Sequence, residues 1–349
     1  MKKLFFTIVA ALVNTAMTFA QSSVLATLSH DGEISTYYGA TALKQAHAAA
    51  QHGDVITLSS GSFQAVDITK ALTIRGAGMQ TDSIANIYPS VVVGAFYINV
   101  ADTLEQHLTV EGIYFDNNAV TVYNKLKNAT FVKSRFFSFA SIYGSTHGYG
   151  YMVNLAFIHC KIANDFNNSN GSNSVSFVNS VIMNPTVGSI DFTNNSFEFT
   201  NCVIRWNTKS PSDVSFYAIY KNCILSTDAN SSTGCLPSSN MIYNSLGIAS
   251  VDMFKNFRSS GNNMFYKASN LSDMFKSWNG TFTDKENFEL KEDAKTTYPG
   301  DDGKELGIYG GNLPFTPNPT NPKITKFNVA SKSTADGKLS VDIEVKAAE

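Results

Sequence analysis

Phe131-Val-Lys-Ser-Arg-Phe136 is the first clear copy of a six-residue phrase that recurs through the middle of the chain. The later copies are Phe157-Ile-His-Cys-Lys-Ile162, Phe177-Val-Asn-Ser-Val-Ile182, Phe199-Thr-Asn-Cys-Val-Ile204 and Tyr220-Lys-Asn-Cys-Ile-Leu225. Looser copies are Ile74-Arg-Gly-Ala-Gly-Met79, Val110-Glu-Gly-Ile-Tyr-Phe115 and Ile242-Tyr-Asn-Ser-Leu-Gly247. From Val110 onward the first positions are 21, 26, 20, 22, 21 and 22 residues apart. A period near 20 residues predicts a solenoid, in which each repeat buries its apolar face against its neighbours.

The phrase also predicts two short strands that meet at a corner. Position one is large and apolar, position four is small and position six is apolar. Strict alternation would place positions one, three and five on one face, so the change of parity after position three requires a bend. Position three is held by Gly76, Gly112, Lys133, His159, Asn179, Asn201, Asn222 and Asn244. Glycine and asparagine tolerate the left-handed backbone of such a bend, and stacked asparagines can bond one another from coil to coil.

The repeat therefore predicts an all-β chain in which each coil belongs to a parallel β-helix. Before it, Ala42 to Ala50 predicts a short amphipathic helix that covers the open end of the first coil. Asp54-Val-Ile-Thr-Leu58 and Ile68-Thr-Lys-Ala-Leu-Thr-Ile-Arg-Gly76 follow this helix, and Gly307-Ile-Tyr-Gly-Gly311 lies near the far end. With these motifs the chain resembles a right-handed parallel β-helix protein of the pectin-lyase-like superfamily, of the secreted type common in Bacteroidetes. The resemblance covers about residues 40 to 315.

The ends of the chain predict three further segments. Residues 1–20 have the features of a signal peptide, because Lys2 and Lys3 precede an apolar stretch that ends in small residues. Residues 21–315 form the predicted β-helix domain with its N-terminal cap, and residues 316–322 form a proline-rich linker. Residues 323–349 form a predicted C-terminal β-hairpin appendage, with Asp336-Gly337 in its turn. We expect an exported protein, secreted or held at the cell surface, in the periplasm or outside the cell.

Composition narrows the class of function. Hydrophobic residues make up 43% of the 349 residues and charged residues 15%, which indicates a globular chain. The formal net charge is −2, so the positive surface that nucleic-acid binding requires is not expected. No stretch after the leader is apolar enough to predict a membrane span.

The four cysteines, Cys160, Cys202, Cys223 and Cys235, have no metal-ligand spacing, and no metal site is predicted. Export permits disulfides, and four cysteines allow three pairings. Cys160, Cys202 and Cys223 share position four of the phrase, so a ladder of small buried thiols is the simpler interpretation.

The resemblance to the pectin-lyase-like superfamily implies a groove along one sheet, where lyases use acids that hold calcium and bases that take a proton. Asp191 is the best acid candidate for such a groove, because its neighbours place it outward on a strand. Arg135 and Lys161 share position five in consecutive coils, about 4.8 Å apart at the backbone, and could hold an anionic sugar. The alternative is that both are solvated residues on the outside of a strand.

A protruding coil supplies the predicted binding residues. The 26-residue interval after Phe131 contains aromatic residues between glycines, and aromatic rings can stack on sugar faces. The predicted substrate-binding residues are Tyr123, Tyr143, His147, Tyr149 and Tyr151. The alternative is that the tyrosines only cover the edge of a coil.

The leading hypothesis is an exported, glycan-associated protein that binds a polysaccharide without turnover and has no cofactor. The first alternative is a polysaccharide lyase that acts on acidic glycans with calcium, with Asp191, Arg135 and Lys161 as its candidate catalytic residues. The second is a structural or adhesive surface protein. The fold alone does not separate these hypotheses, because unrelated functions share it.

Overall fold

The structure is a computed structural model in which the chain is described over most of its length. The described residues are 24–82, 88–101, 107–141, 143–144, 148–149, 151–168, 172–187, 197–213, 218–228, 234–249, 252–254, 265–267, 271–277, 283, 286–318, 323–329, 332–334 and 336–346.

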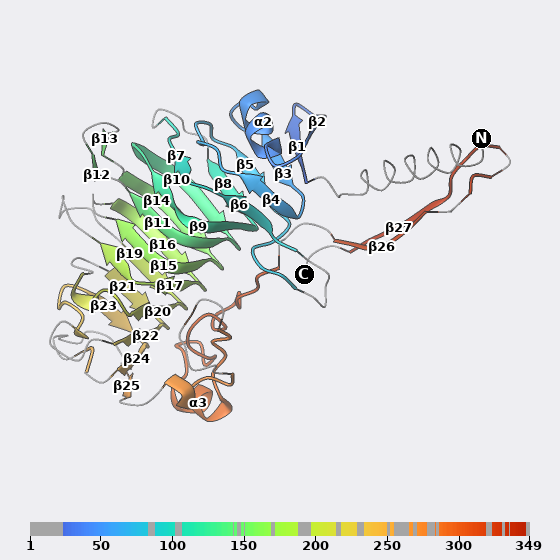
Figure 1. Cartoon of the computed structure of the whole chain (residues 1–349). Helices are drawn as coiled ribbons and strands as arrows, with labels where there is room; N and C mark the ends of the chain where they lie inside the picture. The colour runs from blue at the N-terminus through green and yellow to red at the C-terminus, as the bar shows by residue number, and fades with distance from the viewer. Residues whose placement is uncertain are drawn as a thin grey trace, which may run out of the picture.

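The described part of the chain folds as a parallel β-solenoid of about seven turns, as predicted (Figure 1). The first sheet contains, in spatial order, β2 (Glu33–Tyr38), β1 (Leu25–His30), β3 (Val55–Leu58), β5 (Thr73–Arg75), β8 (Leu108–Glu111), β10 (Lys125–Val132), β14 (Tyr151–Ile158), β16 (Ser172–Val178), β19 (Phe197–Thr200), β21 (Ala218–Lys221) and β23 (Met241–Tyr243). The second contains β25 (Phe265–Lys267), β24 (Leu246–Ala249), β22 (Ile224–Thr227), β20 (Val203–Trp206), β17 (Val181–Met183), β15 (Lys161–Asn168), β11 (Arg135–Ser141), β9 (Ile113–Val122), β6 (Ser90–Val93) and β4 (Gly61–Gln64). β7 (Phe96–Ile98) continues β6 beside β9, and β18 (Pro185–Val187) continues β17 beside β15.

The strand register confirms the alignment of the repeated phrase. Parallel pairing places Ile74, Val110, Phe131, Phe157, Phe177, Phe199, Tyr220 and Ile242 in one row. The rings from Phe131 to Tyr220 stack in this row, with centroids 4.9, 4.7, 5.0 and 5.1 Å apart. These distances match the spacing of strands in a sheet, so each ring lies on its neighbour inside the solenoid.

The corner after position two adopts the predicted left-handed backbone in nearly every coil. Position three has a φ of 67° at Gly112, 47° at Lys133, 54° at His159 and 45° at Asn179, and it is also positive at Asn201, Asn222 and Asn244. The prediction is wrong for Gly76, which is not among the residues with positive φ. A Cβ atom at Gly76 would lie 2.3 Å from the carbonyl oxygen of Gly112, so close packing between coils requires glycine there.

Small polar side chains at position four bond the backbone next to this corner. The Sγ atom of Cys160 donates to the carbonyl of Phe131 at 3.3 Å, and Cys202 and Cys223 make the equivalent bonds to Phe177 and Phe199. Ser134, Ser180 and Ser245 occupy the same row in other coils. All four cysteines are buried thiols without a disulfide, which confirms the ladder interpretation.

The N-terminal end of the solenoid is covered by α2 (Ala42–Ala49), the predicted helix, together with β1 and β2. Ala42, Leu43 and Ala46 are buried and belong to the main core. β1 pairs with both β2 and β3 in antiparallel register, a feature that the sequence analysis did not predict.

Residues 286–318, here called the closing segment, run back along the outside of the solenoid from the coil of β24 to that of β15 (Figure 1). They contain α3 (Glu292–Thr297) and follow the short helix η4 (Leu271–Asp273). Leu306 and Ile308 pack against a column of outward residues on the second sheet, within a second apolar cluster. This cluster includes Val181, Val203, Ile224 and Leu246.

The closing segment also uses the asparagine corners. The Nδ2 atom of Asn179 donates to the carbonyls of Ile308 and Gly310, at 2.8 and 2.9 Å. Asn222 donates to Asp301 and accepts from the Asp301 backbone. The expected bonding between corner asparagines is thus replaced here by bonds to another segment.

Asparagine bonding from coil to coil occurs at two other places. Asn124, which precedes β10, donates to Asn99 at 2.5 Å. Asn154 and Asn128 are the fourth residues of β14 and β10, and Asn154 donates to Asn128 at 2.7 Å.

The remaining elements lie outside the main stack. η2 (Pro211–Asp213) follows β20, and β12 (Tyr143–Gly144) pairs with β13 (Gly148–Tyr149) beside the long coil. β26 (Lys323–Val329) and β27 (Val341–Lys346) form the predicted C-terminal hairpin in antiparallel register.

Gly311→Ala tests the fit of the closing segment. Its φ is 75°, and a Cβ atom there would lie 2.2 Å from Nδ2 of Asn201. Gly303 is the matched control, because its φ is 76° and a Cβ atom there would have no neighbour within 4 Å. We expect Gly311→Ala to lower the free energy of unfolding by about 1–3 kcal/mol more than Gly303→Ala, the usual cost of overpacking. Equal losses in urea unfolding would contradict the packing of this segment.

Asp301→Asn tests the acid dependence of the same contact. Lys221 and Asn222 bond the Asp301 carboxylate and lower its pKa. A carboxyl group whose pKa is lower in the folded state stabilises the fold at neutral pH, and this contribution disappears as pH falls through that pKa. We expect the variant to have a lower Tm at pH 7, with a cost of up to about 1 kcal/mol for a partly exposed pair. The two Tm values should converge as pH falls from about 5 to 3.

Glu33→Gln on β2 is the control for the loss of one exposed surface charge in this experiment. A difference between wild type and Asp301→Asn that stays constant down to pH 3 would contradict the proposed ion pair.

Candidate functional site

One row of outward side chains on the second sheet changes character along the solenoid. Register places Val91, Tyr114, Arg135, Lys161, Val181, Val203 and Ile224 side by side, and the residues from Tyr114 onward are position five of the repeated phrase. The closing segment packs on the row from Val181 onward, where the side chains are aliphatic and buried, and its Phe315 ring also lies against Lys161. Tyr114, Arg135 and Lys161 are therefore one aromatic and two basic side chains between the aliphatic residues Val91 and Val181.

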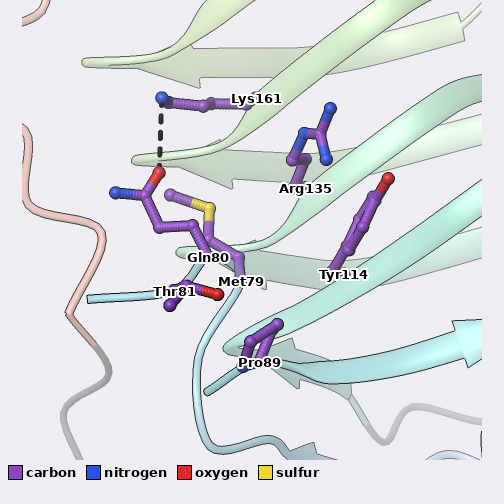
Figure 2. Close-up of a pocket in the computed structure, with 7 residues that line it drawn as sticks. All are labelled: Met79, Gln80, Thr81, Pro89, Tyr114, Arg135 and Lys161. Carbon is purple, nitrogen blue, oxygen red and sulfur yellow. Dashed lines mark hydrogen bonds between the residues drawn. The ribbon is translucent and has the colours of Figure 1, made fainter. Parts of the chain in front are cut away.

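These three side chains form one wall of a cavity of about 350 Å³ (Figure 2). A loop after β5 and the residue before β6 supply the rest of the lining. The lining residues are Met79, Gln80, Thr81, Pro89, Tyr114, Arg135 and Lys161. Among these described residues there are two cations and no carboxylate.

Arg135 and Tyr114 form a fixed pair within the cavity (Figure 2). The guanidinium carbon of Arg135 lies 4.3 Å from the centre of the Tyr114 ring, a cation–π contact. The Tyr114 hydroxyl donates to Asp116 at 2.5 Å. Burial and this hydrogen bond raise the pKa of Tyr114, so the phenol keeps its proton at neutral pH. Asp116 thus holds the ring against which the guanidinium lies.

Lys161 lies at the other side of the cavity, at the end of the closing segment. Its Nζ atom is 3.5 Å from Oε1 of Gln80 and 5.3 Å from the centre of the Phe315 ring. The residue is only 5% exposed. The interpretation that Lys161 is a solvated surface residue is therefore wrong.

The side chain of His159 holds the closing segment at this end of the site by bonding its backbone. Its Nε2 atom lies 3.0 Å from the Leu313 carbonyl, and burial lowers the pKa of its imidazole. A neutral ring that donates Nε2–H to this carbonyl fixes the closing segment next to Lys161. His159 is thus a corner residue that anchors the closing segment.

The geometry suits an anionic ligand. A guanidinium presents two parallel donors that match a carboxylate or a sulfate, and stacking on Tyr114 fixes its plane. Lys161 adds a second positive charge one strand away, because it pairs with Arg135 in the parallel register. An aromatic ring beside two cations is an arrangement that can bind a charged sugar.

Among the other predicted site residues, Tyr123 and Tyr151 are described with their side chains, and neither lines this cavity. Asp191 and His147 lie outside the described residues. Tyr143 and Tyr149 pair with each other in the β12–β13 ladder, and the backbone N–H of Tyr151 donates to Asn124.

Tyr123 stacks on Tyr97 with ring centres 4.9 Å apart. It follows the last residue of β9, whereas Tyr114 is the second residue of that strand, and a bend at Asn117 lies between them. The structure therefore brings Arg135 and Lys161 together but places Tyr123 and Tyr151 at another edge.

Sequence reasoning missed five of the cavity residues. Tyr114 could have been found from the sequence, because it occupies position five of the looser phrase that begins at Val110, the position shared by Arg135 and Lys161. Met79 is position six of the looser phrase that begins at Ile74, whereas Gln80, Thr81 and Pro89 lie outside the repeated phrase and no periodic pattern indicates them.

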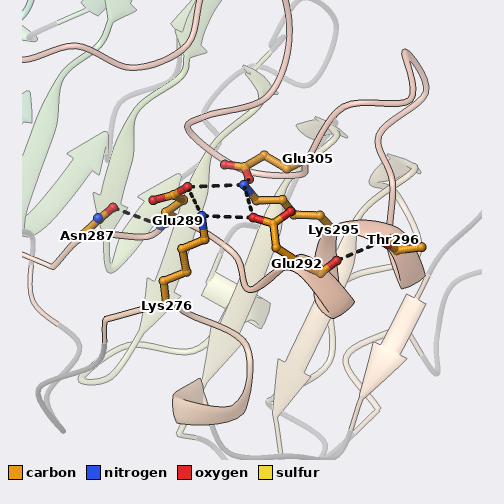
Figure 3. A network of polar contacts seen from close by, with 7 residues as sticks. All are labelled: Lys276, Asn287, Glu289, Glu292, Lys295, Thr296 and Glu305. Atoms are coloured by element: carbon orange, nitrogen blue, oxygen red, sulfur yellow. Dashed lines mark hydrogen bonds and ion pairs between the residues drawn. The ribbon is translucent and has the colours of Figure 1, made fainter.

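A second cluster of charged residues joins α3 to its surroundings (Figure 3). Lys276 contacts Glu289 and Glu292 at 2.5 and 3.0 Å, and Lys295 contacts Glu305 at 2.8 Å. Burial raises the pKa of Glu305 although Lys295 opposes this shift. Each carboxylate in the network contacts a lysine, so the cluster is an anchor for the closing segment.

No group of three or more His, Cys, Asp or Glu residues in the described ranges is arranged to hold a metal ion. Within the same ranges, no helix has the length and apolar character needed to cross a bilayer. A comparison of the chain with protein-family models, curated proteins and solved structures finds no match in any of the three.

Proposed function

We propose that this chain is an exported glycan-binding protein that holds an acidic polysaccharide in the cavity of Arg135 and Lys161 without turnover. The observation that carries the proposal is the meeting of two cations and one aromatic ring in one cavity, within an otherwise aliphatic row. The parallel β-solenoid and the motifs that resemble the pectin-lyase-like superfamily support a glycan as the ligand class. The signal-peptide pattern of residues 1–20 supports export to the periplasm or beyond.

The chemistry of Arg135 and Tyr114 favours binding over elimination. A lyase needs a group that accepts a proton from the sugar at working pH. Arginine stays protonated in proteins, and the raised pKa of Tyr114 keeps its phenol protonated at neutral pH. These two groups can donate hydrogen bonds to a carboxylate but are poorly suited to remove a proton.

Arg135→Gln and Lys161→Gln test this function. The mature chain would be titrated with polygalacturonate, alginate and chondroitin sulfate, with neutral dextran as the uncharged comparison. We expect at least one acidic polymer to bind and each variant to weaken that binding roughly tenfold or more, because each loses a charge-assisted hydrogen bond. Lys209→Gln removes an exposed charge outside the cavity and should bind as wild type does.

The same samples distinguish the alternatives. Because Lys161 is buried, its substitution can also destabilise the fold, so the Tm of each variant would be measured. Arg135 is only half-buried, so a loss of binding in its variant is easier to assign to the lost contact. New ultraviolet absorbance from an unsaturated product, lost with a calcium chelator, would replace the binding proposal with the lyase. Binding to none of the acidic polymers would overturn the proposal and favour a structural or adhesive role.

A further inference from the structure

The cavity is closed toward the C-terminal coils. The next residue in the row after Lys161 is Val181, which is fully buried beneath the closing segment together with Val203 and Ile224. The ring of Phe315 stands against Lys161 at this boundary, and it belongs to the same apolar cluster. A polysaccharide that lies along the row cannot continue past this point without displacing buried side chains.

The part of the row that lines the cavity is short. Tyr114, Arg135 and Lys161 come from three successive coils, so the distance from the first backbone to the third is about 10 Å. The cavity volume of about 350 Å³ is near the lower limit for small-molecule sites. This length and volume suit one or two sugar residues.

We infer that the site binds the end of an anionic oligosaccharide chain, with its terminal one or two residues between Tyr114 and Phe315. This inference rests on the proposed glycan-binding function and adds the part of the glycan that is recognised. Arg135 binds the carboxylate through its two parallel donors, and Lys161 adds the second charge. Phe315 and the closing segment stop the chain, so the remainder of the glycan extends away from the covered row.

The length of the ligand tests the inference. Calorimetric titration would use oligogalacturonates and oligomannuronates of two to eight residues on the intact mature chain. We expect one oligosaccharide per protein and Kd values that differ by less than threefold between the trimer and the octamer. Affinity that rises more than tenfold from trimer to octamer would overturn recognition of a chain end and leave glycan binding intact. Failure of both series to bind would overturn the inference, and the polymer titrations above report separately on glycan binding.

Polymer shearing gives a second readout of chain ends. Polygalacturonate would be broken into shorter fragments, and the number of chain ends per unit mass would be measured. These fragments would then compete with a labelled trigalacturonate for the protein. We expect the competing strength per unit mass to rise in proportion to the number of chain ends. Competing strength that stays constant per unit mass would show binding to internal residues and would overturn the inference.

Arg135→Lys tests the carboxylate contact with the charge preserved. We expect roughly tenfold weaker binding for every chain length, because lysine lacks the planar pair of donors. Lys209→Arg, the reverse exchange at an exposed position, is the matched control and should change nothing. Unchanged affinity in Arg135→Lys would show that only net charge is recognised and would overturn the assigned contact.

Discussion

The left-handed corner at position three is the constraint on which the rest of the structure depends. At this corner the alternation of inward and outward side chains shifts by one residue between two short strands. Positions one and six therefore both point into the core. Only a few residue types adopt this backbone without strain, and the sequence supplies glycine or asparagine at most of the corners. Because every coil turns at the same place, the aromatic rings of position one fall into one stack, and the small residues of position four bond the backbone beside them.

The corners do more than turn the chain. Asn179 and Asn222 present their amides to the closing segment, which thereby lies over the outward row of the second sheet. The glycine-rich stretch from Gly307 to Gly311 fits against the corners and the row, since added Cβ atoms would collide with Ile224 and Asn201. The solenoid therefore has an outer apolar layer in its C-terminal half, in addition to its internal core.

The candidate site exists because this outer layer ends. One row of side chains is aliphatic where the closing segment covers it, and its aromatic and basic residues lie in the three coils next to that covered part. The last residues of the closing segment, held by His159 and packed on Lys161, form the boundary. The same segment thus stabilises the fold and limits the length of ligand that the site can hold.

The fold class, the coil register and the place of nearly every corner could be predicted from the sequence, because each of these depends on contacts between residues one period apart. The sequence also placed Arg135 beside Lys161, since both share one position of the repeat. It did not predict β1 and β2 at the first coil, nor the cavity, whose other walls come from Met79–Thr81 and Pro89, nor the packing of the closing segment beside it. Those contacts join residues as far apart as His159 and Leu313, which are 154 positions apart, and no periodic pattern encodes them. Which outward residues are buried and which remain open to a ligand therefore depends on contacts that form only in the folded chain.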